Sequence, residues 1–364
     1  MERTAATAVE MAAVWSDRHG LHAPGGEVWV GVRTPGTELP ARAERIHAAL
    51  TASGVRFVPA EPHPDDILLR VHDEALLVYL AGAWDEWVAA GLTVDPGQDR
   101  VVPYMFPHPG LLDGASGAVP TAIAARAGQF AFDTMTLIGP GTWEAVRAAV
   151  DVALTAAQLV LDGEPAAYAC CRPPGHHVTR TAFGGSCYLN NTAVAAARLH
   201  DGLGGPVAVI DIDAHHGNGT QSIFYDDPEI LVGSVHVDPG AGWFPHFLGF
   251  ADEAGTGRGA GANRNFPLAP GGGDAPWLEA IAHLAEWARA GGARGLVVAL
   301  GVDAAGGDPE SPLDVSADGF RAAGRELGRL GLPTVVVQEG GYELTTIGAL
   351  VGEALAGIEE GRPG

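Results

Sequence analysis

Short apolar segments rich in Val, Ile, Leu and Ala alternate along the chain with longer segments of helical period. A continuous apolar run is typical of a strand that is buried on both faces, and parallel sheets covered by helices are built from such strands. The pattern therefore predicts an α/β protein with helices on both sides of a mainly parallel central sheet. The candidate strands are VWVGV (28–32), AAYACC (166–171), VAVIDID (207–213), ILVGSVH (230–236), GLVVALG (295–301) and TVVVQEG (334–340).

The segments between these runs have the spacing of amphipathic helices. Over residues 142–163, apolar side chains recur every three or four positions and form one stripe. Similar stripes over residues 65–90, 277–289 and 320–330 predict three more helices. The 364 residues would allow two domains, but no linker of low complexity divides them, so we expect a single domain spanning residues 1–364.

The charge balance bears on partners. The chain has 44 acidic and 21 basic side chains, every base being Arg, and a formal net charge of −23. A strongly negative surface repels polyanions and attracts cationic amines, so we expect no nucleic-acid partner.

Membrane and secretion signals are also weak. No apolar run approaches the roughly 18 to 20 residues of a membrane-spanning helix, and Glu2 and Glu10 interrupt the apolar stretch that a secretory signal needs. Cys170, Cys171 and Cys187 form no CxxC pair. These observations predict a cytoplasmic protein with no membrane partner.

The segment VAVIDIDAHHGNGT, residues 207–220, carries the strongest chemical signal. Side chains alternate along a strand, so Asp211, Asp213 and His215 point the same way at the strand's carboxyl end, where open parallel sheets bind ligands. Burying these groups together is costly unless a metal or partners compensate them. Asp303 follows the strand at 295–301 and brings another carboxylate to the same edge, which predicts a metal site with open positions, as in catalytic zinc sites.

Two further strands end in polar side chains. In RPPGHH, two prolines hold a rigid approach to His176 and His177; adjacent imidazoles suit acid–base work, although such pairs also occur in surface turns. Gly340 and Gly341 precede Tyr342, whose hydroxyl would donate to an oxyanion or whose ring would cover the sheet end. Together with the metal site, these groups favour metal-assisted amide hydrolysis.

Five motifs in this order, RPPGHH, GGSCYLNN, DIDAHHGNGT, ALGVDAAGGDP and EGGY, resemble the histone deacetylase superfamily. HVDPGAGWFPHFLGF followed by GTGRGAGANRNFPL is most similar to its acetylpolyamine amidohydrolase branch, and the resemblance runs from about Ser16 to the C-terminus. It implies a three-layer α/β/α sandwich of the arginase/deacetylase fold. Dimers shape the active-site entrance in that branch, which makes a homodimer one expectation for this chain.

The resemblance also assigns metal ligands. Asp213, His215 and Asp303 are expected to bind one zinc ion per chain, and Tyr342 is expected to polarise the scissile carbonyl. The family also binds a monovalent cation, usually potassium, beneath the zinc. The matching residues here are Asp211, Ser234 and Val235, with backbone oxygens of Asp213 and His215.

His176 and His177 are expected to be the acid–base pair, oriented by Asp211 and Asn218 respectively. Asn218 stands where some relatives carry Asp. The pKa of His177 should therefore be lower than in an Asp-paired version, because a nearby carboxylate favours the imidazolium. Which histidine acts as base and which as acid stays open.

Gly185, Ser186, Trp243 and Phe244 are expected to line the substrate tunnel. Ser186 occupies a place where relatives usually carry Phe or Tyr, while Phe244 keeps the opposite wall. Loss of a ring that would bury on the order of 150 Å² opens the tunnel and favours a bulkier or shorter substrate than a plain aliphatic amine.

A polyamine tunnel is expected to place a carboxylate near residues 119–129, but this loop, VPTAIAARAGQ, contains no Asp or Glu. Polyamine specificity therefore does not follow from the resemblance alone. Asp113, Asp238 and Glu343 are the nearest candidates in the sequence to replace that carboxylate.

The sequence as a whole predicts a zinc-dependent deacetylase acting on a small-molecule acylated amine, such as an acetylated polyamine. Three alternatives remain: a protein acetyl-lysine deacetylase, a dimanganese ureohydrolase-like enzyme, and a non-catalytic protein that binds acylated ligands. The remaining signals are interpreted as structural. The GxGxxG match at 255–260 lies outside any strand, and Cys187 is expected to be a buried thiol. We expect packing roles for His216 and His236, core positions for Trp84 and Trp87, and a pocket or turn position for His246.

Overall fold

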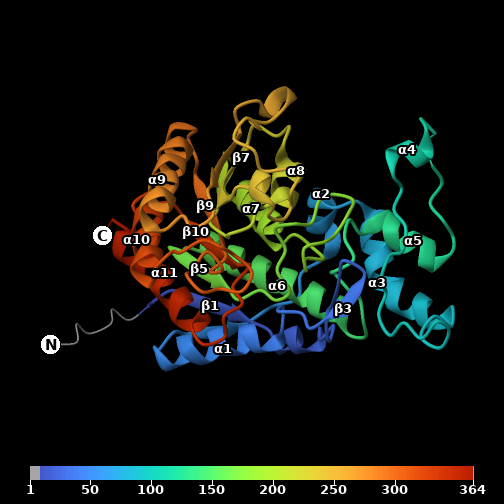
Figure 1. Ribbon diagram of the computed structural model, residues 1–364. Helices are drawn as coiled ribbons and strands as arrows, with labels where there is room; N and C mark the ends of the chain where they lie inside the picture. The colour runs from blue at the N-terminus through green and yellow to red at the C-terminus, as the bar shows by residue number, and fades with distance from the viewer. Residues whose placement is uncertain (1–8, 116, 364) are drawn as a thin grey trace.

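The computed structural model describes residues 9–115 and 117–363, and its centre is one parallel sheet (Figure 1). Eight strands pair in the order β4-β1-β5-β10-β9-β6-β7-β8. Their bounds are β1 Ala12–Trp15, β4 Phe57–Pro59, β5 Ala166–Ala169, β6 Val207–Asp211, β7 Ile230–Val237, β8 Asn263–Leu268, β9 Gly295–Leu300 and β10 Thr334–Gln338.

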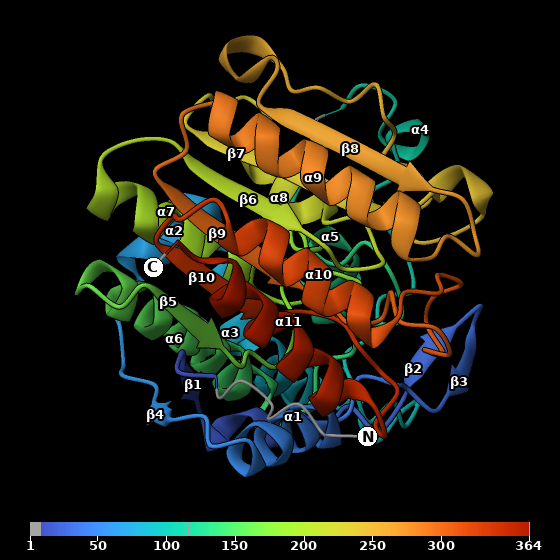
Figure 2. The same ribbon diagram turned by 90° about the vertical axis from the view of Figure 1, so that its left-hand side faces the viewer.

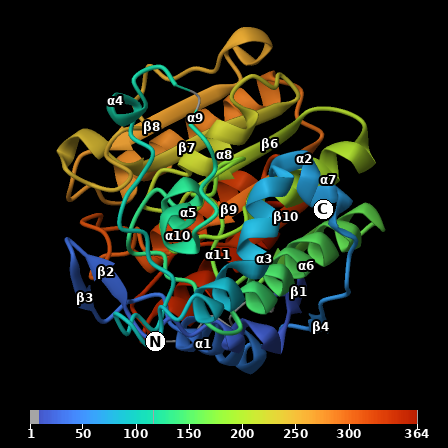
Figure 3. The same cartoon turned by 90° about the vertical axis from the view of Figure 1, so that its right-hand side faces the viewer.

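Helices cover both faces of this sheet, and the core therefore has two layers. Along β10, Val335 and Val337 pack against one helical layer and Val336 against the other, because side chains alternate along a strand. Figure 2 shows the layer of α9, α10 and α11, and Figure 3 the opposite layer with α3, α6 and α7. The α-helices are α1 Pro40–Ala52, α2 Leu68–Val71, α3 Glu74–Ala89, α4 Pro109–Leu112, α5 Ile123–Phe130, α6 Thr142–Leu161, α7 Asn191–Leu203, α8 Asn218–Phe224, α9 Asp274–Ala290, α10 Ala317–Gly328 and α11 Ile347–Gly361, with short 3₁₀ turns at Asp17–Leu21, Asp65–Ile67, Pro239–Ala241 and Gly257–Gly259.

This arrangement confirms the predicted three-layer α/β/α fold class. Five of the six predicted strands and the helices over residues 142–163, 277–289 and 320–330 are present as β5, β6, β7, β9, β10, α6, α9 and α10. Among the described residues, no helix combines the length and apolar character that a bilayer crossing requires.

The predicted strand at 28–32 is wrong as a strand of the central sheet. It forms an antiparallel hairpin of β2 Glu27–Trp29 and β3 Val32–Thr34, which stands apart from that sheet in Figures 2 and 3. Val30 and Gly31 form the turn with positive φ angles of 48° and 78°, as tight hairpin turns require. The run is apolar but is not covered, since Val30 is 82% exposed.

Three other differences have local causes. The helix predicted over residues 65–90 is interrupted, because His72 is extended and its ring pairs with the Thr179 carbonyl and the Asn190 amide. The loop predicted at 119–129 is wrong over most of its length, because α5 spans Ile123–Phe130 and buries Ile123, Ala127 and Phe130 at helical spacing. Strands β1, β4 and β8 were not predicted, since β1 and β4 are short and β8 carries the polar letters NRN.

The parallel strands bring the chemical motifs to one edge. β6 pairs with β9 so that Asp211 lies beside Ala299, and β10 pairs with β9 so that Gln338 lies beside Leu300. The segments that follow β5, β6, β9 and β10 therefore leave the sheet side by side. They contain RPPGHH, DAHHGNGT, GVDAAGGDP and EGGY.

Candidate active site

Three predicted ligands meet at this edge. The side-chain donor atoms of Asp213, His215 and Asp303 all lie within 4.8 Å of one another. His215 Nδ1 lies 3.1 Å from Asp303 Oδ2 and 3.3 Å from Asp213 Oδ1, and both carboxylates are fully buried. Burial and the charge of Asp213 raise the pKa of Asp303 to about 7. Two buried carboxylates facing one imidazole fit a divalent cation such as zinc, which would compensate their charge.

The turn after β10 closes beneath this cluster. The Gly340 amide donates to Asp213 Oδ2 at 2.7 Å, and a Cβ at position 340 would lie 2.3 Å from Asp303 Oδ2. Only glycine permits this approach. The EGGY motif therefore supports the predicted metal ligands as well as delivering Tyr342.

The predicted imidazole pair lies beside the cluster, with ring centroids 4.0 Å apart. His176 Nδ1 is 2.9 Å from Asp211 Oδ2, and both residues are buried. Burial alone would lower the pKa of His176, but the charges of Asp211 and Asp213 outweigh it and raise that pKa to about 10. The two carboxylates therefore favour the imidazolium form of His176.

His177 is held in the opposite state. Its Nδ1 donates to the Asn218 amide oxygen at 2.7 Å, which leaves Nε2 as the atom with the lone pair. Burial, with the nearby His176 and His215, holds the pKa of His177 well below its ordinary value, although the hydrogen bond to Asn218 opposes the shift. Burial is the largest cause of this shift, and the lower pKa expected from Asn218 in place of Asp stays a prediction.

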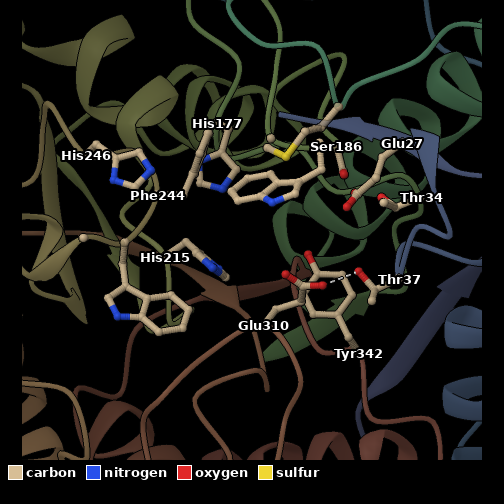
Figure 4. A pocket seen from close by; sticks show the side chains of 15 residues that line it. Glu27, Thr34, Thr37, His177, Ser186, His215, Phe244, His246, Glu310 and Tyr342 are labelled. Carbon is tan, nitrogen blue, oxygen red and sulfur yellow. Dashed lines mark hydrogen bonds between the residues drawn. The ribbon is translucent and has the colours of Figure 1, made fainter. Parts of the chain in front are cut away.

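Tyr342 lines the same pocket as His177 and His215 (Figure 4). Its amide donates to Asp308 Oδ2 at 2.8 Å, and the Arg42 guanidinium lies 4.5 Å from the centre of its ring. Burial raises the pKa of Tyr342 well above its ordinary value. The phenol therefore keeps its proton and can donate a hydrogen bond.

Glu339 is a buried residue of the site that sequence reasoning missed. One oxygen, Oε2, accepts from the Gly175 and His176 amides at 2.6 and 3.1 Å, and Oε1 accepts from the Thr192 hydroxyl at 2.6 Å. This carboxylate fixes the turn that carries both histidines. Its place within EGGY was visible in the sequence, but its partners, more than 140 positions away, were not.

The pocket in front of the cluster has a volume of about 450 Å³. The pocket lining includes all four predicted residues, Gly185, Ser186, Trp243 and Phe244. His246 lines the pocket as well. Gly185 has a φ of +61°, and a Cβ there would lie 2.3 Å from His177 Cδ2, so this loop passes directly against the imidazole. Trp29 and Met135 also line the pocket and give its wall further apolar surface.

The acidic groups of the pocket are not those expected. Asp113, Asp238 and Glu343 are absent from its lining, and Glu27 and Glu310 are present. Figure 4 shows both carboxylates turned into the pocket, with Glu310 Oε1 accepting from Thr37 Oγ1 at 2.7 Å. Glu310 directly follows the GGDP motif and had a local signal, whereas Glu27 lies in the hairpin that was assigned to the sheet.

The residues expected for the monovalent cation are also adjacent. Asp211 and Ser234 are direct neighbours on β6 and β7. Ser234 Oγ lies 2.8 Å from His236 Nδ1, while His236 Nε2 donates to the Gly249 carbonyl at 2.8 Å. His236 Nδ1 is therefore an acceptor, and the serine oxygen keeps lone pairs for a cation.

Residues given structural interpretations are placed accordingly. His216, His236 and Trp87 are buried, Trp84 packs against the core, and burial raises the pKa of the Cys187 thiol well above its ordinary value.

Comparisons with known proteins agree with this geometry. The model of the histone deacetylase domain matches residues 36–358. Acetylpolyamine amidohydrolase from Mycoplana ramosa is 39% identical over 349 residues, covering 96% of this chain and 99% of that protein. Acetylpolyamine amidohydrolase 1 from Pseudomonas aeruginosa is 39% identical over 353 residues, with the same shares covered.

Solved structures give the same result. The crystal structure of acetylpolyamine aminohydrolase from Burkholderia pseudomallei matches with a TM-score of 0.91 at 35% identity, covering 97% of this chain and 100% of that one. The HDA15 HD domain matches with a TM-score of 0.77 at 27% identity, covering 98% and 91%. The chain therefore belongs to the histone deacetylase family and has the arginase/deacetylase fold. This membership supports a hydrolase of the deacetylase class.

Proposed function

We propose that this protein is a zinc-dependent amidohydrolase that removes an acetyl or short acyl group from a small cationic amine. The observation that carries the proposal is the convergence of Asp213, His215 and Asp303 beside His177 and Tyr342 at one pocket. We expect one zinc ion per chain. When bound there, zinc would act as a Lewis acid, the chemistry that amide hydrolysis requires.

The side chains around this centre have distinct proton-transfer roles in the proposal. Neutral His177 would accept a proton from the attacking water at Nε2 and later deliver it to the leaving amine. Cationic His176 would remain charged and stabilise negative charge close to it. Tyr342 would donate its hydrogen bond to the oxygen of the scissile carbonyl.

A monovalent cation, expected from the family resemblance to be potassium, would complete this centre. Asp211, Ser234 and Val235 would hold it together with backbone oxygens of Asp213 and His215. Its charge would compensate the buried Asp211 carboxylate.

Two observations support a cationic substrate. Several relatives are named acetylpolyamine amidohydrolases. Within this chain, burial and the charges of Glu310 and Asp133 raise the pKa of Glu27 to about 7. An ammonium group placed between Glu27 and Glu310 would relieve that repulsion, so an acetylated polyamine or a similar amine fits the pocket.

A single zinc ion is favoured over the two manganese ions of a ureohydrolase. Among the described residues, the other cluster with metal-ligand spacing is His176, Cys187 and Glu339. Burial raises the pKa of the Cys187 thiol well above its ordinary value, and His176 Nδ1 already pairs with Asp211 Oδ2 at 2.9 Å. That cluster therefore offers a second ion only one carboxylate, Glu339, whereas the cluster proposed for zinc offers two.

A matched substrate panel tests the proposal. The zinc-loaded protein is assayed with mono-N-acetyl-1,4-diaminobutane, with N-acetylbutylamine, which lacks the charge, and with an acetyl-lysine peptide. We expect the diamine to give the highest kcat/KM. Equal turnover of the first two would contradict the cationic-substrate assignment, preference for the peptide would favour a protein deacetylase, and binding without turnover would favour a ligand-binding protein.

A further inference from the structure

A second cavity of about 630 Å³ adjoins the catalytic pocket, and no proposed step uses it. Four residues line both spaces and therefore form the partition between them: Trp29, Met135, Phe244 and His246. The second cavity also reaches Asn218, the partner of His177. The two spaces are thus neighbours beside the catalytic residues.

The chemistry of the second cavity differs from that of the catalytic pocket. Glu27 and Glu310 face the catalytic pocket, but neither lines the second cavity. The one carboxylate in the second lining is Asp133, whose oxygens accept from the amides of Gly185, Met135 and Thr136 and from the Thr136 hydroxyl. That carboxylate is committed to the backbone and leaves the cavity wall predominantly apolar.

The apolar wall comes from segments distant in sequence. Val28 and Val30 come from the hairpin, Phe132 follows α5, and Phe247 and Leu248 lie in the loop after β7. Phe132 stacks on Phe244 of the partition at a centroid distance of 6.3 Å. Val30 and Phe247 remain 82% and 86% exposed, so the rim presents apolar surface that an occupant would cover.

We propose that this second cavity is an accessory substrate site, which takes an apolar group, aromatic or branched aliphatic, carried on the amine side of the acylated substrate. This inference rests on the proposed function. The volume is that of a small-molecule site, and an apolar occupant fits it because the wall is predominantly apolar and its one carboxylate is committed to backbone amides. The preferred substrate would thus place its amide at Tyr342, its ammonium at the two glutamates and its apolar group across the partition.

A pair of substrates with equal charge tests the assignment. Mono-N-acetyl-1,4-diaminobutane is compared with its analogue that carries a benzyl group on the distal nitrogen, which stays protonated. We expect kcat/KM to be about tenfold higher for the benzyl substrate, since burying even one methylene in an apolar site changes specificity by that order. Equal values would overturn the inference.

Two variants locate the effect. Ala182 lines only the second cavity, so Ala182→Leu fills it, and Phe247→Ser removes apolar surface at the rim. Either change should bring the benzyl preference close to one. Val32→Ser is the matched control, because Val32 lies on the same hairpin, is 62% exposed and lines neither space. Retention of the full preference in both cavity variants would contradict the inference.

The remaining outcomes are separable. If neither amide is hydrolysed by the zinc-loaded protein, the proposed function itself fails. If the small diamine is hydrolysed but the ring gives no advantage, only the accessory site fails. Light scattering on the wild type and on Phe247→Ser tests a different occupant: a lower mass for the variant would show that a second copy of the chain covers the rim, and it would overturn the assignment to substrate.

Discussion

Asp213 and Asp303 lie fully buried at the edge of the sheet, whereas Trp29 and Val30 project from a hairpin outside it. The first region is held by strand register and by hydrogen bonds from Gly340 and the Ala214 amide. The second is held by its own turn and a few side-chain contacts. The proposed chemistry therefore depends on the most buried polar groups of the protein, whereas the proposed substrate selection depends on partly exposed side chains of the hairpin.

The largest effect is expected from removing a predicted zinc ligand from the buried region. His215→Ala would leave only two carboxylates, and we expect more than about a 100-fold loss in zinc affinity, which exceeds the usual cost of losing a residue that merely supports a ligand. Metal content after dialysis measures the loss. His246→Ala is the control, because this imidazole lines the same pocket outside the donor cluster and its loss should leave zinc bound.

Tyr342→Phe separates catalysis from metal binding. Loss of the hydroxyl removes one donor to the carbonyl oxygen, and we expect turnover to fall by about 10²- to 10³-fold with zinc retained. Steady-state kinetics and metal analysis on the same sample check both parts. An unchanged kcat would refute the role of the phenol.

Glu339→Gln tests whether the buried Glu339 carboxylate positions His176 and His177. The amide has one acceptor oxygen in place of two, so the Gly175–His176 turn would loosen, and we expect kcat to fall by about 10- to 100-fold at nearly constant KM. The pH profile of kcat should shift in the same variant. Glu343→Gln, whose carboxylate accepts from Thr345 at the surface, should leave both unaltered; equal effects of the two variants would contradict a positioning role.

Glu27, which lines the catalytic pocket, is expected to make substrate binding depend on pH. Because its pKa is about 7, it is mostly protonated at pH 6 and ionised at pH 8, so KM for a cationic substrate should fall as pH rises through this range. The KM for neutral N-acetylbutylamine is the internal control and should not change with pH. Glu27→Gln should flatten the profile, and persistence of the slope would assign it to another group.

The same shift affects stability. The folded protein binds this proton more tightly than the unfolded chain, so the contribution of Glu27 to stability is lost as pH rises from the ordinary value of 4.5 to about 7. Glu27→Gln should therefore remove part of any decline in unfolding free energy over that window. Denaturant unfolding at pH 5 and pH 8 measures it.

The smallest effect is expected on the exposed hairpin. Val32→Ser should change the unfolding free energy by no more than about 0.5 kcal/mol, as is usual for surface substitutions. Val336→Ala, at a fully buried position in β10, should cost about 2 kcal/mol. Similar losses of unfolding free energy for the two variants would contradict the contrast between the buried sheet edge and the exposed hairpin.

The buried region was largely predictable from sequence, because its signals are local. Alternation along 207–213 placed Asp211 and Asp213 on one face, and parallel strands necessarily bring their carboxyl ends to one edge. Asp303 and Tyr342 could be added because each lies a few residues after the end of an apolar strand. The pairings of His176 with Asp211 and of His177 with Asn218, taken from the family resemblance, agree with the geometry.

The hairpin and the other segments that line the pocket were not predictable in the same way. An apolar β-branched run reports strand propensity but not whether the strand joins the main sheet, so VWVGV was placed in the wrong sheet. Glu27 reaches the pocket from the hairpin and Met135 from the segment between α5 and α6, and no local spacing encodes either position. The hydrogen bonds of Glu339 likewise depend on segments brought together by tertiary packing.

A metal titration tests the central claim most directly. Zinc is added in steps to the chelator-stripped protein while hydrolysis of mono-N-acetyl-1,4-diaminobutane is followed. We predict that turnover rises linearly and reaches its plateau at one equivalent per chain. A plateau at two equivalents, or full turnover before any metal is added, would contradict the proposal of an amidohydrolase with one zinc ion per chain.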